Sequence, residues 1–277
     1  MAILQMTMMS QALMRTVPVT VVLPFDKMLF PGMQPRQEGA YKTLYLLHGV
    51  IGSTLDWLSG TRIERFAVEH DLCVVMPSGD NAFYLDHPER HDYYGDFIGR
   101  ELVELTRKAF PLSHRREDTF LGGLSMGGYG ALRNGLKYHE TFGAVCALSS
   151  ALLLDELQDR KPNAPFFLES REYAEACFGE LSKVAGSDKD PLWLAEQLQK
   201  SGAPLPLVYM ACGRQDPLLP ANDKFAAALQ SLGYTVTYEV DPGAHEWDFW
   251  DTHIRRAIDW LPLGNAASGV SSGNVGI

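Results

Sequence analysis

Ser125 lies at the centre of residues 123–127 (GLSMG), which fit the G-x-S-x-G pattern of a nucleophile elbow. A serine hydroxyl becomes an effective nucleophile when a base within hydrogen-bond reach takes its proton. That base is most often a histidine oriented by a carboxylate. The five-residue pattern is weak evidence by itself, because short motifs also arise by chance. The rest of the chain must therefore supply a base, an acid and a strand that ends at Ser125.

His245 is the best candidate for the base. Where the serine lies in a nucleophile elbow, the acid and then the histidine come later in the chain. His139 follows Ser125 too closely to leave room for an acid at an intervening strand end. His253 falls within a predicted helix, where we expect it on the helix surface. His245 instead occupies a loop directly after the last predicted strand, so we predict that it is the base.

Asp216 is the best candidate for the acid. It follows the predicted strand 205–212 and precedes a proline, and an Asp-Pro pair alone usually indicates the start of a turn. Its position past a strand end, between the serine and the histidine, favours a catalytic role. Asp241 competes with it, but it lies only four residues before His245 and is better interpreted as a turn residue.

Two backbone N–H groups are candidates for an oxyanion hole. Acyl transfer places a negative charge on the former carbonyl oxygen, and each preorganised donor can stabilise it by about 3 kcal/mol. One expected donor is the N–H of Met126, directly after the nucleophile, and the other comes from the loop after strand 43–47. In that loop Val50 is the first choice and Ile51 the second.

Short apolar runs alternate with helical patterns along most of the chain. This alternation predicts an α/β fold with a largely parallel sheet and helices on both faces, and ligands bind beyond the carboxyl ends of such strands. Segment 12–23 should be an edge strand, since Pro18 cannot donate to a ladder. Gly127, Gly128 and Gly130 should let the helix after Ser125 pack closely. The other predicted strands are 43–47, 72–76, 119–122, 143–149, 205–212 and 234–240, and the other predicted helices are 61–70, 94–110, 172–181, 191–199 and 246–261.

One helical pattern, 94–110, is long enough to predict its buried face. Regular helical spacing places on one side Phe97, Ile98, Leu102, Leu105 and Ala109.

The sequence predicts a single domain over residues 1–263. The irregular segment 151–204 is long for a connection between strands, and such insertions usually serve as lids or binding surfaces. Its apolar residues Phe166, Phe167 and Trp193 also suggest contacts between subunits, so a homo-oligomer is one expectation. The glycine- and serine-rich tail 264–277 is expected to be disordered.

Composition narrows the classes of partner. The net charge of −10 disfavours nucleic acid, which proteins bind largely by neutralising phosphates with lysine and arginine. No apolar stretch is long enough for a membrane span, and the N-terminal residues lack the features of a signal peptide, so we expect a cytoplasmic protein. Cys73, Cys146 and Cys212 lie in apolar runs and should be buried. No nucleotide-binding motif or metal-ligand spacing is visible, so neither a cofactor nor a metal is predicted.

Several segments together resemble a known family. They are YLLHG (45–49) with Trp57, MPSG (76–79) with Phe83 and Tyr84, GGLSMGG (122–128), Cys212 and Gly213 leading to Asp216, and GAHEW (243–247) with Phe249 and Trp250. In this order they look like the esterase D and tributyrin esterase family of α/β-hydrolases, which includes feruloyl-type esterases and relatives of S-formylglutathione hydrolase. The likeness implies the α/β-hydrolase fold, a triad of Ser125, Asp216 and His245, and an oxyanion hole formed by Val50 and Met126.

The resemblance implies a serine carboxylesterase that hydrolyses short-chain acyl esters of small molecules through an acyl-enzyme intermediate. The alternatives are a feruloyl or acetyl esterase acting on plant-derived sugar esters and an S-formylglutathione-type thioesterase. The short HGVIGS loop and the HEW sequence after Ala244 look closer to tributyrin esterase than to the thioesterase. A binding module without activity is a further alternative, which the complete set of catalytic candidates disfavours. Segment 151–204 shows little likeness, so the resemblance leaves the choice of ester open.

Residues near the strand ends are candidates for the substrate pocket. Core packing is the alternative for each aromatic among them, and helical spacing from Ile254 and Ile258 favours it for Trp250. The pocket candidates are His48, Gly49, Ile51, Trp57, Phe83, Tyr84 and Trp247.

Overall fold

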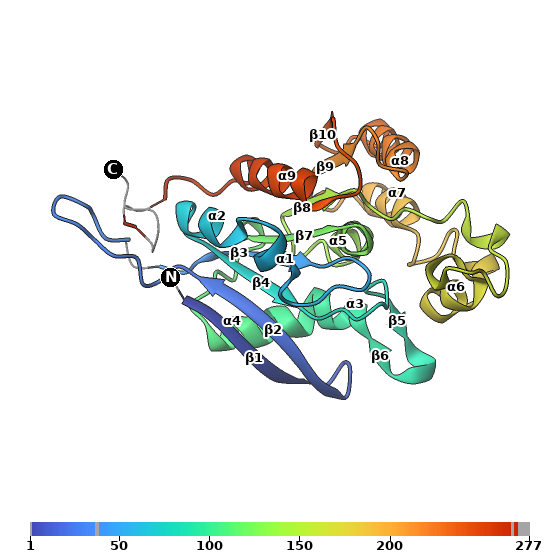
Figure 1. Cartoon of the computed structure of the whole chain (residues 1–277), viewed down its shortest axis with the longest axis horizontal. Helices are drawn as coiled ribbons and strands as arrows, with labels where there is room; N and C mark the ends of the chain where they lie inside the picture. Colours follow the sequence, from blue (N-terminus) through green and yellow to red (C-terminus); the bar gives the residue numbers. More distant parts are fainter. Residues whose placement is uncertain (1, 37–38, 267–268, 271–277) are drawn as a thin grey trace.

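The structure is a computed structural model that describes residues 2–36, 39–266 and 269–270. An eight-stranded sheet crosses it in the order β1-β2-β4-β3-β7-β8-β9-β10 (Figure 1). From β4 to β10 the neighbouring strands are parallel, whereas β1 and β2 pair antiparallel with each other and β2 pairs antiparallel with β4. The strands are β1 (Ala2–Ser10), β2 (Arg15–Leu23), β3 (Lys42–Leu47), β4 (Leu72–Pro77), β7 (Thr119–Leu124), β8 (Ala144–Leu148), β9 (Leu207–Gly213) and β10 (Val236–Asp241).

Helices cover both faces of the sheet, which confirms the predicted α/β class. Side chains of α1, α2 and α9 pack on one face, and side chains of α4, α5, α7 and α8 pack on the other. The helices are α1 (Asp56–Gly60), α2 (Ile63–Glu69), α3 (Tyr94–Asp96), α4 (Leu102–Ala109), α5 (Met126–Lys137), α6 (Arg171–Phe178), α7 (Pro191–Ser201), α8 (Leu219–Ser231) and α9 (Trp247–Trp260).

Smaller elements fill the connections. The strands β5 (Asp86–His87) and β6 (Asp92–Tyr93) form a two-stranded sheet of their own. The short helical turns are η1 (Pro88–Arg90), η2 (Phe97–Glu101), η3 (Arg116–Asp118), η4 (Leu157–Asp159), η5 (Phe167–Glu169) and η6 (Leu181–Lys183).

The prediction that the strand containing Pro18 is an edge strand was wrong. Strand β1 lies at the edge, and β2 lies between β1 and β4. Pro18 is tolerated because the β2–β4 ladder begins one residue later, at Val19 opposite Pro77. The carbonyl of Pro18 accepts a hydrogen bond from the N–H of Ser78, just beyond the end of β4. The missing N–H of proline therefore faces a place where the ladder has already ended.

The predicted helix 94–110 contains a π-helical turn, η2, between α3 and α4. A π turn inserts one residue and rotates everything that follows around the helix axis. As a result Val103 and Thr106 are buried, whereas Leu105 is only partly buried and Ala109 is exposed. The predicted face is therefore correct within the π turn, at Phe97 and Ile98, and directly after it, at Leu102, and wrong farther along α4, at Leu105 and Ala109.

The predicted disordered tail is described only in part. Val270 exchanges two backbone hydrogen bonds with Met28, each 3.0 Å, so the expectation of disorder does not hold at this residue. Residues 267–268 and 271–277 lie outside the described residues. All four cysteines are free and buried, as expected for Cys73, Cys146 and Cys212.

Arg133 anchors segment 151–204 to helix α5. It is fully buried, its Nε donates to the carbonyl of Asp188 at 2.9 Å, and its Nη2 lies 2.6 Å from the Asp188 carboxylate. We predict that Arg133→Met lowers the free energy of unfolding by about 2–4 kcal/mol, because it removes a buried charge that pairs with Asp188 and, at 3.6 Å, with Asp86. The carboxylate of Asp188 is 44% exposed and keeps Lys137 as a partner, which limits the loss.

Urea unfolding at neutral pH measures this effect. Arg171→Met is the matched control, since Arg171 forms an exposed ion pair with Glu175 on α6 and such pairs contribute less than about 1 kcal/mol. Equal losses in the two variants would show that burial of Arg133 adds nothing.

Candidate active site

Ser125 lies in a strained turn between β7 and α5. Its backbone has φ 54° and ψ −119°, an arrangement that a serine adopts only where the surroundings impose it. Gly127 makes the close approach possible, because a Cβ there would lie 2.4 Å from the carbonyl oxygen of Leu47. Gly128 meets Leu148 and Ser150 in the same way, and Gly130 meets the ring of Tyr84. The turn has the geometry of a nucleophile elbow, with Ser125 only 8% exposed.

The structure brings Ser125, His245 and Asp216 together from the ends of three strands. Ser125 Oγ lies 3.1 Å from His245 Nε2, and His245 Nδ1 lies 2.8 Å from Asp216 Oδ2. When Nδ1 donates to the carboxylate, Nε2 is left as the acceptor for the serine hydroxyl. The imidazole remains 32% exposed, whereas the Asp216 side chain is fully buried. The arrangement can therefore move a proton from the hydroxyl to a histidine that a buried carboxylate orients.

The surroundings of Asp216 favour its charged form. Burial by itself would raise its pKa, but hydrogen bonds from His245, from the N–H of Leu218 and from the Ser149 hydroxyl outweigh burial and hold the pKa below its ordinary value. The Leu218 bond is 2.9 Å long and reaches Oδ1, so the two carboxylate oxygens serve different donors.

Trp250 packs against His245, and Ser149 donates a hydrogen bond to Asp216. The indole N–H of Trp250 donates to Ser149 Oγ at 3.1 Å, and its ring meets the His245 ring edge to face at a centroid distance of 4.9 Å. Ser149 also has a left-handed backbone, with φ 44°. Ser149 was not among the predicted site residues, although its place directly after β8, beside the end of β7, is the signal that could have identified it.

Met126 and the loop after β3 supply the candidate backbone N–H groups for an oxyanion hole. Met126 begins α5, so its N–H has no intrahelical acceptor. Between the two candidates in the loop after β3, the N–H of Ile51 is already bound to Asn81 Oδ1 at 2.7 Å. Within the described part of the chain the N–H of Val50 donates to no protein acceptor, which favours Val50 over Ile51.

Several pocket candidates lie in the core beneath the site. Trp57 donates from its indole N–H to the carbonyl of Leu47 at 3.1 Å, and the hydroxyl of Tyr84 donates to the carbonyl of His48 at 2.9 Å. Phe83 packs against Tyr129 and other rings. These side chains are at most 3% exposed, so core packing applies to Trp57, Phe83 and Tyr84.

The remaining pocket candidates differ in exposure. Burial lowers the pKa of His48, whose Nε2 accepts from the N–H of Gly79 while Nδ1 lies 2.6 Å from the carbonyl of Gly49. Trp247 is partly buried and meets Trp57 and Trp250 edge to face, and Ile51 is 79% exposed. Of the seven candidates, Ile51 and Trp247 present the most side-chain surface to solvent.

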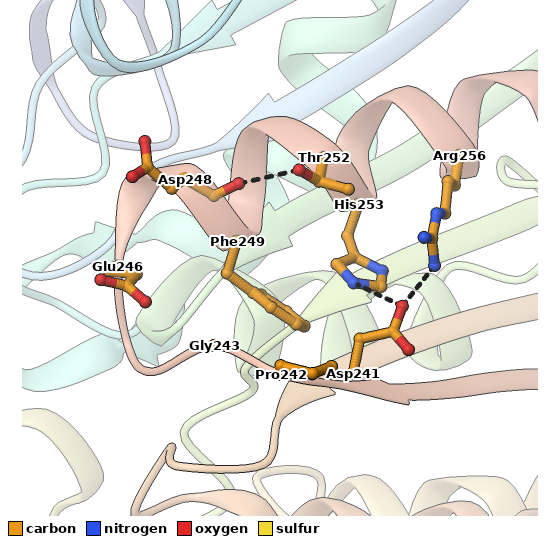
Figure 2. Close-up of a pocket in the computed structure, with 9 residues that line it drawn as sticks. All are labelled: Asp241, Pro242, Gly243, Glu246, Asp248, Phe249, Thr252, His253 and Arg256. Carbon is orange, nitrogen blue, oxygen red and sulfur yellow. Dashed lines mark hydrogen bonds and ion pairs between the residues drawn. The ribbon is translucent and has the colours of Figure 1, made fainter.

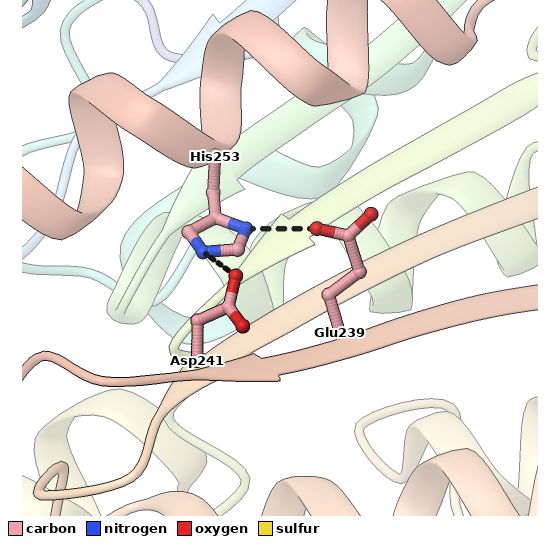
Figure 3. A group of neighbouring side chains, drawn as sticks. All are labelled: Glu239, Asp241 and His253. Atoms are coloured by element: carbon pink, nitrogen blue, oxygen red, sulfur yellow. Dashed lines mark ion pairs between the residues drawn. The ribbon is translucent and has the colours of Figure 1, made fainter.

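The prediction that His253 lies on the helix surface was wrong. Its ring is buried and stacks on Phe249, one helical turn earlier, at a centroid distance of 4.0 Å. Figure 3 shows the ring between two carboxylates, with Nδ1 3.4 Å from Glu239 and Nε2 3.6 Å from Asp241. Burial lowers the pKa of His253, which favours a neutral ring. The helical spacing of Phe249 and His253 places both on the buried face of α9.

Asp241 forms an ion pair with Arg256, which makes it a weaker candidate than Asp216 for the catalytic acid. Its carboxylate lies 2.5 Å from Arg256 Nη1, and the same nitrogen lies 2.8 Å from Glu239. Asp241 and Arg256 border an open hollow of about 480 Å³ beside the loop that carries His245 (Figure 2). Among the described residues, Glu239, Asp241 and His253 are the one group whose ligand atoms lie close enough to hold a metal ion, but Arg256 already occupies both carboxylates.

No described helix combines the length and the apolar character that crossing a bilayer requires.

The chain is similar to known proteins over most of its length. The sequence model of a family described as "Putative esterase" matches residues 10–261. An acetyl esterase from Caldicellulosiruptor saccharolyticus is 42% identical over 261 residues, which are 94% of this chain and 98% of that protein.

Two solved structures from Staphylococcus aureus are also similar. The fluorophosphonate-binding serine hydrolase FphF superposes with a TM-score of 0.81 at 33% identity, and the S-formylglutathione hydrolase FrmB with a TM-score of 0.80 at 32% identity. Each comparison covers 94% of this chain and 98% of the other.

Proposed function

Since this chain belongs to the putative esterase family and is a carboxylic ester hydrolase with the α/β-hydrolase fold, we propose that Ser125, His245 and Asp216 are its catalytic triad. The observation that carries this assignment is the continuous chain of contacts, 3.1 Å from Ser125 Oγ to His245 Nε2 and 2.8 Å from His245 Nδ1 to Asp216 Oδ2. Asp216 orients the imidazole and stabilises it when it becomes charged.

The reaction follows from these contacts. His245 Nε2 takes the hydroxyl proton as Ser125 Oγ attacks the ester carbonyl, and the charge on the carbonyl oxygen is stabilised by the N–H groups of Met126 and Val50. His245 then gives its proton to the leaving alcohol, and the acyl group remains on Ser125. A water molecule loses a proton to His245 and attacks the acyl-enzyme, the bond between the acyl carbon and Ser125 Oγ breaks to release the acid, and His245 returns the proton to Ser125 Oγ.

We propose short-chain acyl esters as the substrates, with acetyl esters first among them. The support is the 42% identical relative, which is an acetyl esterase. We expect kcat/KM to be highest for p-nitrophenyl acetate or butyrate and at least about tenfold lower for the octanoate, since a site fitted to a small acyl group loses affinity and orientation with a long one. A series of p-nitrophenyl esters of increasing acyl length measures this preference, and an optimum at the octanoate would contradict it.

A thioesterase acting on S-formylglutathione is the second candidate. It is favoured by one finding, the 32% identical S-formylglutathione hydrolase that covers 94% of this chain. Feruloyl and acetylated sugar esters are further alternatives. Rates on S-formylglutathione, methyl ferulate and acetylated xylan, compared with p-nitrophenyl acetate at equal enzyme concentration, separate these candidates.

We also propose that residues 1–263 form one domain in which segment 151–204 covers the site as a lid. The support is the position of α6, whose Tyr173 and Cys177 both bind the carbonyl of Asn81, in the loop after β4. Limited proteolysis tests the single domain: cleavage at an end of segment 151–204 that released a stably folded fragment would contradict it.

A further inference from the structure

The loop that carries Val50 is held by a second loop. We call residues 48–53 the oxyanion loop and residues 78–84 the clamp loop. Three hydrogen bonds join them: Gly79 N–H to His48 Nε2 at 2.9 Å, Tyr84 Oη to the carbonyl of His48 at 2.9 Å, and Ile51 N–H to Asn81 Oδ1 at 2.7 Å. The first two hold the start of the oxyanion loop. Asn81 alone, among these, holds the residue directly after Val50.

Ile51 has a backbone conformation that needs such support. Its φ is 59°, in the left-handed region that a β-branched residue rarely adopts, and such an outlier costs about 1–3 kcal/mol. Its side chain is 79% exposed, so packing does not supply the compensation. The hydrogen bond to Asn81 acts directly on the strained residue. It holds the peptide group between Val50 and Ile51, which adjoins the peptide group that carries the Val50 N–H.

Asn81 is itself held from the other side by α6 of segment 151–204. Its carbonyl accepts from the hydroxyl of Tyr173 at 2.9 Å and from Cys177 Sγ at 3.3 Å. Burial raises the pKa of the Cys177 thiol to about 11, so the thiol keeps its proton and can donate at neutral pH. Phe83, two residues after Asn81, packs on Phe178 of α6 at a centroid distance of 4.9 Å. One residue therefore contacts both the oxyanion loop and α6.

We propose that Asn81 is a positioning residue that fixes the Val50 N–H for the oxyanion. The hydrogen bond from Tyr173 to Asn81 makes the position of this N–H depend on the position of segment 151–204. The inference rests on the proposed function, since it takes Val50 as an oxyanion donor. It makes the segment a contributor to the rate and not only to the choice of substrate. Asn81 touches no reacting atom and acts only through the backbone of the oxyanion loop.

The test begins with Asn81→Ala. We expect kcat for p-nitrophenyl acetate to fall by about 10- to 100-fold, because a misplaced donor loses transition-state stabilisation even though it remains present. KM should change less than about threefold, because the carbonyl oxygen of the bound substrate carries little charge before the reaction and depends little on the oxyanion donors. Inhibition by a trifluoromethyl ketone, whose adduct with Ser125 carries an oxyanion, should weaken in parallel with kcat.

Tyr173→Phe tests the link to α6 with less risk to folding. It removes the hydroxyl that binds the Asn81 carbonyl and keeps the ring that packs on Phe167. We expect a fall in kcat of about threefold at constant KM, a fraction of the effect of moving the donor directly. Tyr238→Phe is the matched control, because it loses one hydroxyl bond to Asp223 on α8, and its kcat should equal that of the wild type.

The outcomes separate the inference from the proposed function. A wild-type protein that fails to hydrolyse the ester would remove the proposed function itself. An active wild type together with unchanged kcat in Asn81→Ala, or a change in KM alone, would overturn the positioning role. If Asn81→Ala does not fold, Tyr173→Phe decides: a lower kcat than in Tyr238→Phe supports the proposal, and an equal kcat overturns it.

Discussion

Replacing Ser125 with alanine is expected to lower kcat/KM for p-nitrophenyl acetate by about 10⁴- to 10⁶-fold, the scale on which removal of a catalytic serine acts. The variant removes Oγ, the atom 3.1 Å from His245 Nε2 that would form the bond to the acyl carbon. The fold should survive, because the strained turn at Ser125 is held by backbone bonds, such as that from its own N–H to the carbonyl of Leu148. Circular dichroism and thermal unfolding check that the variant is folded.

Ser150→Ala provides the control. Ser150 is a buried serine close to the same turn, and within the described part of the chain its Oγ has no hydrogen-bond partner. No described histidine accepts a hydrogen bond from it, so its replacement should leave kcat/KM within about twofold of the wild type, as expected for a residue outside the catalytic group. A fluorophosphonate should label the wild type and Ser150→Ala at Ser125 and should not label Ser125→Ala. Substantial hydrolysis by a folded Ser125→Ala would contradict the triad.

The arrangement of the candidate site could be predicted because it depends on strand ends. Parallel strands deliver the residues after their carboxyl ends to one edge, so a serine, an aspartate and a histidine placed after β7, β9 and β10 must gather there. The structure brings Ser125, Asp216 and His245 together in this way. The same rule applied to β8 would have added Ser149.

Features that depend on the partner of an element could not be predicted from its own sequence. Pro18 excludes one hydrogen bond, but only the position where β4 ends shows that this bond is not needed. The π turn at η2 leaves no periodic signal that distinguishes it from a regular helix. Regular helical spacing therefore predicts a buried Ala109, which is exposed in the structure. A position within a helix does not by itself show which side of the helix is buried, and the stacking of His253 on Phe249 shows that it lies on the buried side of α9.

The contact between segment 151–204 and the clamp loop was equally invisible in the sequence. Tyr173 and Cys177 bind Asn81, and more than ninety residues separate each of them from it. A hydrogen bond to a backbone carbonyl does not depend on which side chain that residue carries, so no motif marks it. This contact therefore becomes visible only in the three-dimensional structure.

Replacing Asp216 with asparagine should lower kcat by about 10³- to 10⁴-fold while KM changes little. Burial by itself would raise the pKa of Asp216, yet its hydrogen bonds hold the pKa below the ordinary value, so the group is charged at neutral pH. Asparagine has nearly the same shape but no charge to stabilise the imidazolium. Its amide N–H₂ can also face His245 Nδ1, which would place the proton on Nε2 and leave no acceptor for the Ser125 hydroxyl.

Asp241→Asn distinguishes this mechanism from one in which Asp241, the carboxylate nearer to His245 in the sequence, is the acid. The carboxylate of Asp241 lies 2.5 Å from Arg256 and 3.6 Å from His253, so its neutralisation should loosen that ion pair and change kcat by less than about tenfold. Asp223→Asn, an exposed carboxylate bound to Tyr238, controls for the loss of one negative charge and should leave kcat unchanged. A larger fall in kcat for Asp241→Asn than for Asp216→Asn would transfer the role of acid to Asp241. The predicted order follows from geometry, since Asp216 is the carboxylate that lies 2.8 Å from His245 Nδ1.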